Sequence, residues 1–314
     1  MLLTRLILVC LLLPSLSSAA DGKLTVTWLG MKLHGLAAVV ETPSGKVFLI
    51  DTGNAKQAEG EDYSAGRDAV SPFLKERGYQ EIDGIIISHP HADHFGGVDW
   101  LLNNWKVKQY LDHGYEGRGQ TLSYSRLRGL AVQRGGVHKI VHFGDKLDWD
   151  PELTVEVLSP AKEFFDASSD AAQVPDPVLL NSNSVVLRLQ HGKNVFIFPG
   201  DSLGPTFENH MKTAVLPEKL KATVLTANQH GNAPGVDFPK LVRPQFVVVS
   251  CLADYPANVG TPKPRSPGDF ATEVYGALGA QVFVTGFHGN ITAVSNGQTV
   301  TMSRQHERVK PKVE

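Results

Sequence analysis

The sequence predicts an α/β fold in a single domain, and three observations support this. Apolar stretches of strand length alternate with helical patterns through most of the 314 residues. A hairpin followed by further strands and a helix occurs in the first half of the chain and returns in the second half. Hydrophobic residues make up 42% of the chain, enough to bury a sizeable core, and no Ser/Gly linker or charge block divides it.

The first half begins with residues 23–29, where apolar and polar residues alternate as in a half-buried strand. A hairpin follows, in which strands 37–41 and 47–51 are joined by the turn Pro43-Ser44-Gly45. The remaining elements are predicted from apolar runs and from the glycines that end helices. They are a helix at 67–77, a strand at 82–88, a helix at 94–105, a strand at 106–111, a helix at 123–133 and strands at 139–141 and 153–158.

A polar segment at 161–177 is predicted to be a surface loop between the halves. The second half then opens with a hairpin of strands 184–190 and 194–198 about His191-Gly192, like the hairpin of the first half. The later elements are strands at 223–225 and 245–250, a helix at 270–278, and strands at 281–285, 290–294 and 300–302.

The first 20 residues have the pattern of a secretory signal peptide. Arg5 precedes the apolar run 6–13, and small residues ending at Ala20 follow. The run is too short to cross a hydrocarbon core of about 30 Å as a helix. We therefore expect cleavage after Ala20, a mature domain of residues 21–314 without a stable membrane anchor, and export to the periplasm or the extracellular space.

The overall charge does not indicate a nucleic-acid partner. The chain has 30 Lys and Arg against 32 Asp and Glu, a formal net charge of −2, so no global basic field is available to hold a polyanion. A local groove could still be positive. One region is locally basic through Arg118, Arg126, Arg128, Arg134 and Lys139. A solvated helix face explains that region more simply.

The most informative segment is His89-Pro90-His91-Ala92-Asp93-His94, which has the pattern H-x-H-x-D-H. It comes directly after the apolar run 85–87 and so leaves the end of a buried strand. Imidazole nitrogen and carboxylate oxygen are ligands that zinc, iron and manganese accept. His89 and His91 can face one ion from the loop, while the start of the next helix can direct Asp93 and His94 at a second. A His-rich surface turn is the alternative, but the tight spacing at a strand end argues against it.

This segment resembles the signature of the metallo-β-lactamase superfamily. Three further stretches occur in the order of that superfamily: 48–53 with Asp51, 196–201 with Asp201, and 226–232 with His230. The resemblance extends from about residue 23 to residue 302. It implies an αββα sandwich of two mixed β-sheets flanked by helices, with the ligand loops along one edge.

The resemblance also implies a hydrolase centre with two divalent ions, Zn²⁺ first, with Mn²⁺ or Fe as alternatives. The implied ligands are His89 and His91 for the first ion, Asp93, His94 and His230 for the second, and Asp201 as the bridge. A hydroxide held between the ions would be the nucleophile, so that Asp93 and Asp201 would serve catalysis as ligands. Asp51 would lie outside the ligand set and orient one ligand by accepting its N–H.

The chain departs from the superfamily pattern in ways that leave the number of ions open. Many members carry a further His upstream of the bridging Asp, whereas residues 179–184 hold Asn181 and Asn183 and no His. This substitution is typical of the metallo-hydrolase domain of bacterial DNA-uptake competence proteins, which segments 41–46 and 184–189 also resemble. That group usually has two adjacent His where this chain has Gln229-His230, and residues 30–35 replace its G-Q-G-D-like turn.

Four further polar residues are candidates for a substrate pocket, although a structural role is the more common explanation for residues of this kind: His113, Asn181, Asn183 and His288. His34 is another loop histidine of the same kind. The favoured function is hydrolysis of a phosphodiester by an exported metal-dependent enzyme. The expected partner is thus a small-molecule or phosphodiester substrate, with nucleic acid left open and the oligomeric state unknown. A metallo-hydrolase of a carbon ester, lactone, thioester or β-lactam is one alternative. A non-catalytic or single-metal member that binds a ligand is the other.

Overall fold

The computed structural model of the chain describes residues 21–58, 61–115, 122–165, 176–202, 204–232, 237–253 and 267–308. The expected signal peptide and its cleavage site lie outside the described residues, as do Arg118 and most of the polar segment 161–177.

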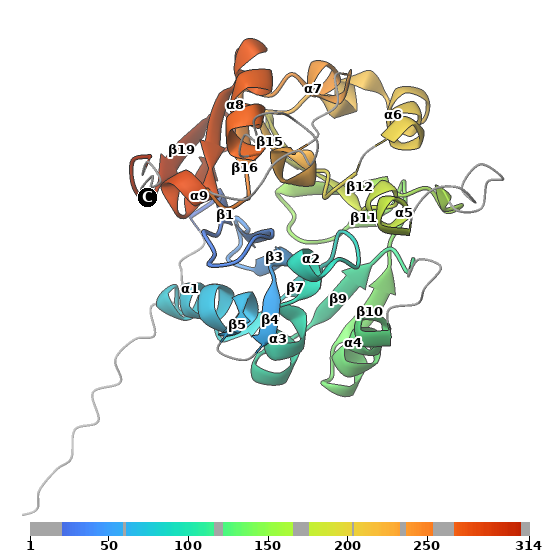
Figure 1. Cartoon of the computed structure of the whole chain (residues 1–314), viewed down its shortest axis with the longest axis vertical. Coiled ribbons are helices and arrows are strands. Elements are labelled where there is room, and N and C mark those ends of the chain that lie inside the picture. Colours follow the sequence, from blue (N-terminus) through green and yellow to red (C-terminus); the bar gives the residue numbers. More distant parts are fainter. Residues whose placement is uncertain are drawn as a thin grey trace, which may run out of the picture.

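Two large mixed sheets form the centre of the molecule (Figure 1). In order across the first sheet, the strands are β10 (Val137–Ile140), β9 (Gln109–Asp112), β7 (Gly84–Ile86), β3 (Val47–Thr52), β2 (Ala37–Glu41), β1 (Leu24–Trp28), β18 (Ile291–Ser295) and β19 (Val300–Arg304). In the second sheet they are β11 (Lys146–Leu147), β12 (Leu153–Ser159), β13 (Val186–His191), β14 (Asn194–Phe198), β15 (Val224–Thr226), β16 (Phe246–Val249) and β17 (Gln281–Val284).

The two sheets repeat one arrangement, as the sequence predicted. In the first sheet the hairpin β2–β3 leads into parallel pairing with β7, β9 and β10. In the second, the hairpin β13–β14 leads into parallel pairing with β15, β16 and β17. Two small sheets complete the strands: β4 (Ala55–Ala58) with β5 (Glu61–Ser64), and β6 (Glu81–Ile82) with β8 (Lys106–Val107).

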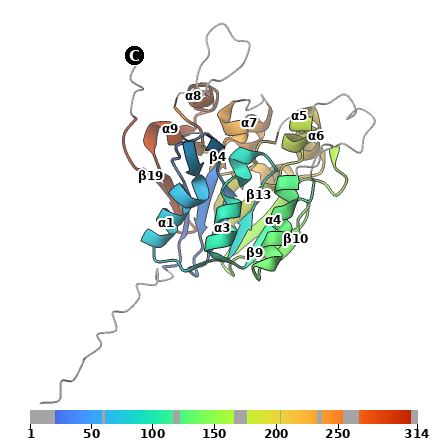
Figure 2. The ribbon, with the colours of Figure 1, turned by 60° about the horizontal axis from the view of Figure 1, so that its bottom comes forward.

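Helices cover the outer face of each sheet, which confirms the predicted αββα sandwich (Figures 1 and 2). Those on the first sheet are α1 (Ser71–Glu76), α3 (Val98–Asn104) and α4 (Leu122–Gln133). Those on the second are α6 (Gly204–Thr213), α7 (Asp237–Val242) and α8 (Pro267–Ala277). Shorter helical segments are α2 (Ala92–Phe95), α5 (Asp176–Ser182), α9 (Thr285–His288), a π-helix (Gly66–Val70) and two 3₁₀ turns (Pro217–Leu220 and Asn228–Gly231).

Strand alternation divides the core into layers. Val40 on β2 and Phe48 on β3 point between the sheets and pack in one cluster with Leu187 on β13. Their neighbours Val39 and Leu49 point the other way, into the cluster under α1, α3 and α4. Because the side chains of a strand alternate between faces, strands covered on both sides are nearly continuous apolar runs. The five residues of β2 and the six of β3 are all buried.

The predicted helix 94–105 is interrupted at Gly96 and Gly97, where α2 ends and α3 begins. A side chain at Gly96 would collide with the backbone of Ala55, and one at Gly97 with the carbonyl of Thr52. The two glycines therefore let this segment lie directly against the backbone that follows β3.

The structure also contains α5, α6 and α7, which were not predicted from the sequence. In α6 the two residues Phe207 and Met211 are buried against the second sheet. With so short a buried stripe, the sheet packing rather than the sequence periodicity decides that this segment is helical. Within the described residues, no helix is both long and apolar enough to span a membrane.

Candidate metal centre

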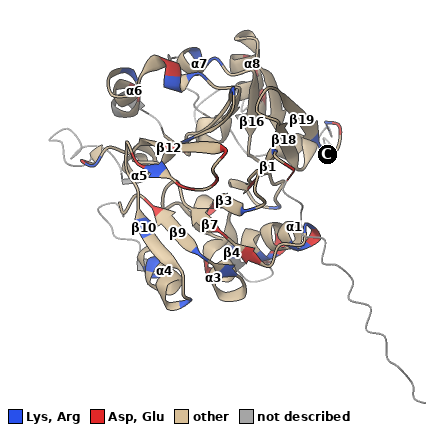
Figure 3. Cartoon of the chain, turned by 180° about the vertical axis from the view of Figure 1, so that it is seen from behind, with Lys and Arg blue, Asp and Glu red and all other residues tan. Residues whose placement is uncertain are grey.

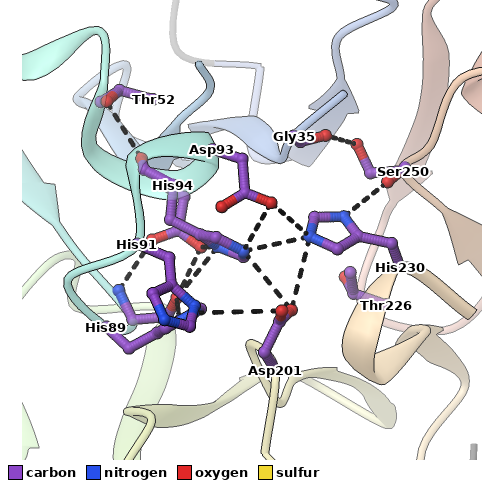
Figure 4. Close-up of polar contacts among 12 residues, drawn as sticks. Gly35, Thr52, His89, His91, Asp93, His94, Asp201, Thr226, His230 and Ser250 are labelled. Carbon is purple, nitrogen blue, oxygen red and sulfur yellow. Dashed lines mark hydrogen bonds and ion pairs between the residues drawn. The ribbon is translucent and has the colours of Figure 1, made fainter. Parts of the chain in front are cut away.

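The candidate site lies where parallel strands of both sheets end. Asp51 is near the end of β3, and the His89 loop follows β7, which runs parallel to β3. Asp201 follows β14 and His230 follows β15, a second parallel pair. Because the carboxyl ends of parallel strands meet at one edge of a sheet, loops far apart in the sequence converge here (Figure 4).

Ser88 and Asp51 orient two of the histidines. The backbone N–H of Ser88 donates to Oδ1 of Asp51 at 2.7 Å, and its hydroxyl donates to Oδ2 at 2.8 Å. Oδ2 also lies 2.8 Å from Nδ1 of His94, so this nitrogen carries the proton. The Ser88 hydroxyl then accepts from Nδ1 of His89 at 3.0 Å. With Nδ1 engaged in this way, both imidazoles turn Nε2 toward the other donors of the cluster.

His89 and His91 form the first pair of donors. Nε2 of His89 lies 2.9 Å from Nδ1 of His91, and their rings meet edge to face. His89 is fully buried, while His91 caps the start of α2 in an extended conformation. Oδ2 of Asp201 lies 3.9 Å from Nε2 of His89.

Asp93, His94 and His230 form the second group, as drawn in Figure 4. Nε2 of His230 lies 3.2 Å from Oδ2 of Asp93 and 3.1 Å from Nε2 of His94. Oδ1 of Asp201 lies 3.4 Å from Nε2 of His94 and 3.5 Å from Nε2 of His230. One oxygen of Asp201 thus faces the first group and the other faces the second.

The backbone at His230 is held in an uncommon conformation. Gln229 and His230 have φ values of 48° and 52°, a left-handed region that residues other than glycine rarely adopt. Conformations of this kind cost about 1–3 kcal/mol each and persist where the surrounding structure enforces them. Here Nδ1 of His230 donates to the carbonyl of Ser250 at 2.7 Å, which leaves Nε2 facing the cluster.

The carboxylates and imidazoles perturb each other's pKa values. Burial acts to lower the pKa of His94, but Asp201, Asp51 and Asp93 outweigh burial and raise it well above its ordinary value. Burial would raise the pKa of Asp93, yet His94 and His230 hold it far below its usual range. The cluster therefore carries buried negative charge that protons or a metal cation must balance.

His34 is a residue of this cluster that the sequence analysis did not select as a ligand. Its Nε2 lies 4.0 Å from Oδ2 of Asp93, and its ring centroid lies 4.2 Å from that of His230. Burial, and then His230, lower the pKa of His34 to about 3, so its imidazole is neutral. No local motif marked it, because it enters the site from the loop between β1 and β2.

The candidate pocket residues take separate positions. His113 is buried beside Tyr115 and Phe164, with Nδ1 accepting the N–H of Tyr115. Asn183 accepts the N–H of Phe165 and donates to the carbonyl of Leu179. Asn181 is also buried, and its side-chain oxygen Oδ1 has no hydrogen-bond partner among the described residues. His288 bonds within its own turn, to the backbone of Val284, and has no contact with the His/Asp cluster in the described part of the chain.

The chemistry of the donor set fits divalent metal ions. Two groups each bring three ligand atoms within 4.8 Å of one another: His89, His94 and Asp201, and His34, Asp93 and His230. Bonds of about 2.0–2.2 Å to a common ion place ligand atoms roughly 3 to 4 Å apart, the range seen here. Imidazoles with Nδ1 engaged by Ser88, Asp51 or Ser250 present Nε2 as the ligand atom.

A model of the metallo-beta-lactamase superfamily matches residues 31–213, which is more than half of the chain. The chain belongs to the metallo-beta-lactamase superfamily. It is thus a metal-dependent hydrolase, and membership of this superfamily does not specify its substrate.

Curated relatives agree with this assignment. ComE operon protein 3 of Bacillus subtilis (strain 168) is 27% identical over 215 residues, which cover 64% of this chain and 25% of that protein. YcaI of Escherichia coli (strain K12) is 25% identical over 283 residues, 89% of this chain and 31% of that protein. The chain therefore spans only about a quarter to a third of the length of these two relatives. A UPF0173 metal-dependent hydrolase of Anaeromyxobacter sp. (strain K) is 26% identical over 253 residues, 78% of this chain and 80% of that protein.

Solved structures agree on the fold. The metallo-beta-lactamase fold protein YhfI from Bacillus subtilis has a TM-score of 0.50 at 13% identity, over 83% of this chain and 96% of that one. The CmlA beta-hydroxylase E377D mutant has a TM-score of 0.51 at 12% identity, over 86% of this chain and 53% of that one. At such low identity these likenesses bear on the fold alone.

Proposed function

We propose that this superfamily member binds two divalent metal ions and hydrolyses a phosphodiester outside the cytoplasm. The observation that carries the proposal is the position of Asp201. Its Oδ2 faces His89, while its Oδ1 faces both His94 and His230. A carboxylate with one oxygen toward each donor group is suited to bridge two cations.

The residues of the chain would divide the work of holding and orienting the ions. His89 and His91 would hold the first ion, Asp93, His94 and His230 the second, and Asp201 both. Asp51 and Ser88 would fix the tautomers of His94 and His89, as their hydrogen bonds indicate. When bound, two ions would supply a water of lowered pKa and would stabilise the negative charge that develops on the substrate oxygens. Asp93 and Asp201 would serve catalysis as ligands, and Zn²⁺ is the metal we expect first, because the donor set combines imidazole and carboxylate.

A phosphodiester is favoured over a carbon ester for two reasons. The match to ComE operon protein 3 accords with the resemblance to the competence proteins. An anionic substrate would also gain most from two adjacent cations.

A long nucleic acid has less support as the substrate. Arg126 and Arg128 of the locally basic region are paired with Asp99 and Asp112, and Figure 3 shows basic and acidic segments interspersed. We propose a short phosphodiester, with nucleic acid as an outcome to be tested.

The test uses purified residues 21–314, with metal content measured by mass spectrometry. Turnover is measured on bis(p-nitrophenyl) phosphate, a dinucleotide, p-nitrophenyl acetate, a lactone and a chromogenic β-lactam. We expect two ions per chain and hydrolysis of the two phosphodiesters above the other substrates. Cleavage of only the ester, lactone or β-lactam would overturn the phosphodiester proposal. Full metal loading without any turnover would favour a ligand-binding protein.

Export is tested separately, on the full chain expressed in a bacterium with a signal peptidase. We propose a mature N-terminus at Asp21 in the periplasmic or culture fraction. N-terminal sequencing that finds Met1 on cytoplasmic protein would contradict export without affecting the hydrolase proposal.

A further inference from the structure

His34 lies beside the second donor group, next to Asp93 and His230. Three ligand atoms, from His34, Asp93 and His230, lie within 4.8 Å of one another. The Nε2 of His34 is 4.0 Å from Oδ2 of Asp93, and the rings of His34 and His230 are 4.2 Å apart between centroids. His34 is 9% exposed, so it meets this group inside the protein.

The distance between His34 and Asp93 fits two ligands of one metal ion and does not fit a direct hydrogen bond. At 4.0 Å the imidazole nitrogen and the carboxylate oxygen are too far apart to share a hydrogen bond. Two ligand atoms that each bind one ion at about 2.0–2.2 Å can lie up to roughly this distance apart. The same carboxylate oxygen is 3.2 Å from Nε2 of His230, a separation that also falls within this range.

The backbone around His34 is fastened to the elements that carry the other ligands. The carbonyl of His34 accepts from the side chain of Asn54 at 3.1 Å, and the N–H of Leu36 donates to the carbonyl of Asp93 at 3.0 Å. A side chain at Gly35 would collide with that same carbonyl of Asp93, so glycine permits the close approach.

Ser250 connects His34 to His230. Its hydroxyl donates to the carbonyl of Gly35 at 2.9 Å, and its own carbonyl accepts from Nδ1 of His230 at 2.7 Å (Figure 4). A single residue therefore fixes the backbone beside His34 and the tautomer of His230. Such shared support is what a ligand pair requires if both imidazoles are to face one ion.

From this arrangement we infer that His34 is a protein ligand of the second metal ion. The inference rests on the proposed two-metal centre. It gives the two metal sites different numbers of protein ligands. The second ion would be held by His34, Asp93, His94 and His230 in addition to Asp201, and would have few open positions. The first would be held by His89, His91 and Asp201, and Asn181 and Asn183 occur in the stretch where many superfamily members carry a further His. Closed sites are structural and open sites accept substrate, so the phosphodiester would bind at the first ion.

The first test counts bonded imidazoles in the wild-type protein. The chain is labelled with ¹⁵N-histidine and loaded with ¹¹³Cd²⁺, and nitrogens coupled to cadmium are counted by NMR. We expect five such imidazoles, His34 included, and four would overturn the inference. The count needs no substitution, so it stands even if a variant folds poorly.

The second test compares His34→Gln with His306→Gln, which removes an exposed histidine far from the ligand groups in sequence. Removing a partner outside the ligand shell commonly costs 10–100-fold in metal affinity, so losing a ligand should weaken the second ion by at least about 100-fold. His306→Gln should bind both ions like the wild type. His34→Gln with unchanged affinity for both ions would refute the inference. Intact metal binding without phosphodiester turnover in the wild type would instead refute the proposed function and leave the His34 assignment standing.

Discussion

Nδ1 of His94 lies 2.8 Å from Oδ2 of Asp51, and both side chains are fully buried. Asp51 also accepts the N–H and the hydroxyl of Ser88, so its carboxylate is completely engaged as an acceptor. The pair decides which nitrogen of His94 faces Asp201 and His230. Through this contact, the end of β3 orients the imidazole of His94 on α2.

Replacing Asp51 by Asn should therefore reduce metal affinity without removing a ligand. The amide offers N–H donors where His94 requires an acceptor, so the imidazole loses its preferred tautomer. A loss of about 10–100-fold is expected for a partner of this kind. Isothermal titration of the metal-free protein with Zn²⁺ measures the loss. Asp99→Asn, at an exposed residue paired with Arg126, is the control, and equal affinities in the two variants would contradict the orienting role.

Replacing Asp201 by Ala should remove the charge shared by the two donor groups. We expect loss of one ion. We also expect the rate of hydrolysis to fall on the order of 10³-fold or more, because several kcal/mol of transition-state stabilisation are lost. The fold should persist, because Asp201 lies in a loop at the edge of the sheet. His113→Ala should reduce turnover less, since His113 lies beside Tyr115 and Phe164. An Asp201→Ala protein with two ions and full activity would eliminate the two-metal mechanism.

Replacing Thr226 by Val should destabilise the core beside the last ligand loop. Nε1 of Trp28 donates to Oγ1 of Thr226 at 2.9 Å, and both residues are buried. Valine matches the shape of threonine but leaves the indole N–H unsatisfied, at a cost of about 1–3 kcal/mol. The free energy of unfolding in urea measures the change. Thr226→Ser keeps the hydroxyl and should recover part of the loss, so a serine variant no more stable than the valine variant would argue against the hydrogen bond.

Asp112 should make stability depend on pH in strong acid. Burial opposes ionisation of Asp112, but hydrogen bonds from His138 and Arg128 outweigh burial and lower its pKa to about 2. A depressed carboxyl pKa stabilises the fold above the unfolded value of about 3.9, and this contribution is lost as pH falls through about 2. The contribution is about 2–3 kcal/mol by linkage. The difference in unfolding free energy between wild type and Asp112→Asn should shrink by that amount between pH 6 and pH 2. A difference independent of pH would contradict the shift.

Much of the fold could be predicted because strand and turn signals are local. The hairpin about Ser44 and the hairpin about Gly192 follow from their apolar runs and turn residues, and both occur in the structure. The close approach of Gly96 and Gly97 to the backbone of Ala55 and Thr52 could not be predicted, since it joins segments that are distant in the chain. The helix α6 was not predicted because much of its stability comes from the packing of Phe207 and Met211 on the second sheet, and a short segment does not reveal such packing in its sequence.

By itself, the sequence determined the donors that are neighbours in the chain. His89, His91, Asp93 and His94 are confined to one loop and one helical turn, so their proximity follows from covalent connection and the end of β7. Only the tertiary structure decided which distant residues join them. His34 reaches Asp93 because Gly35 and Leu36 pack against its backbone, and Asp201 reaches both donor groups because two sheets place their strand ends at one edge. Such contacts depend on the packing of whole layers, and packing between layers leaves no periodic signal in the residues that meet.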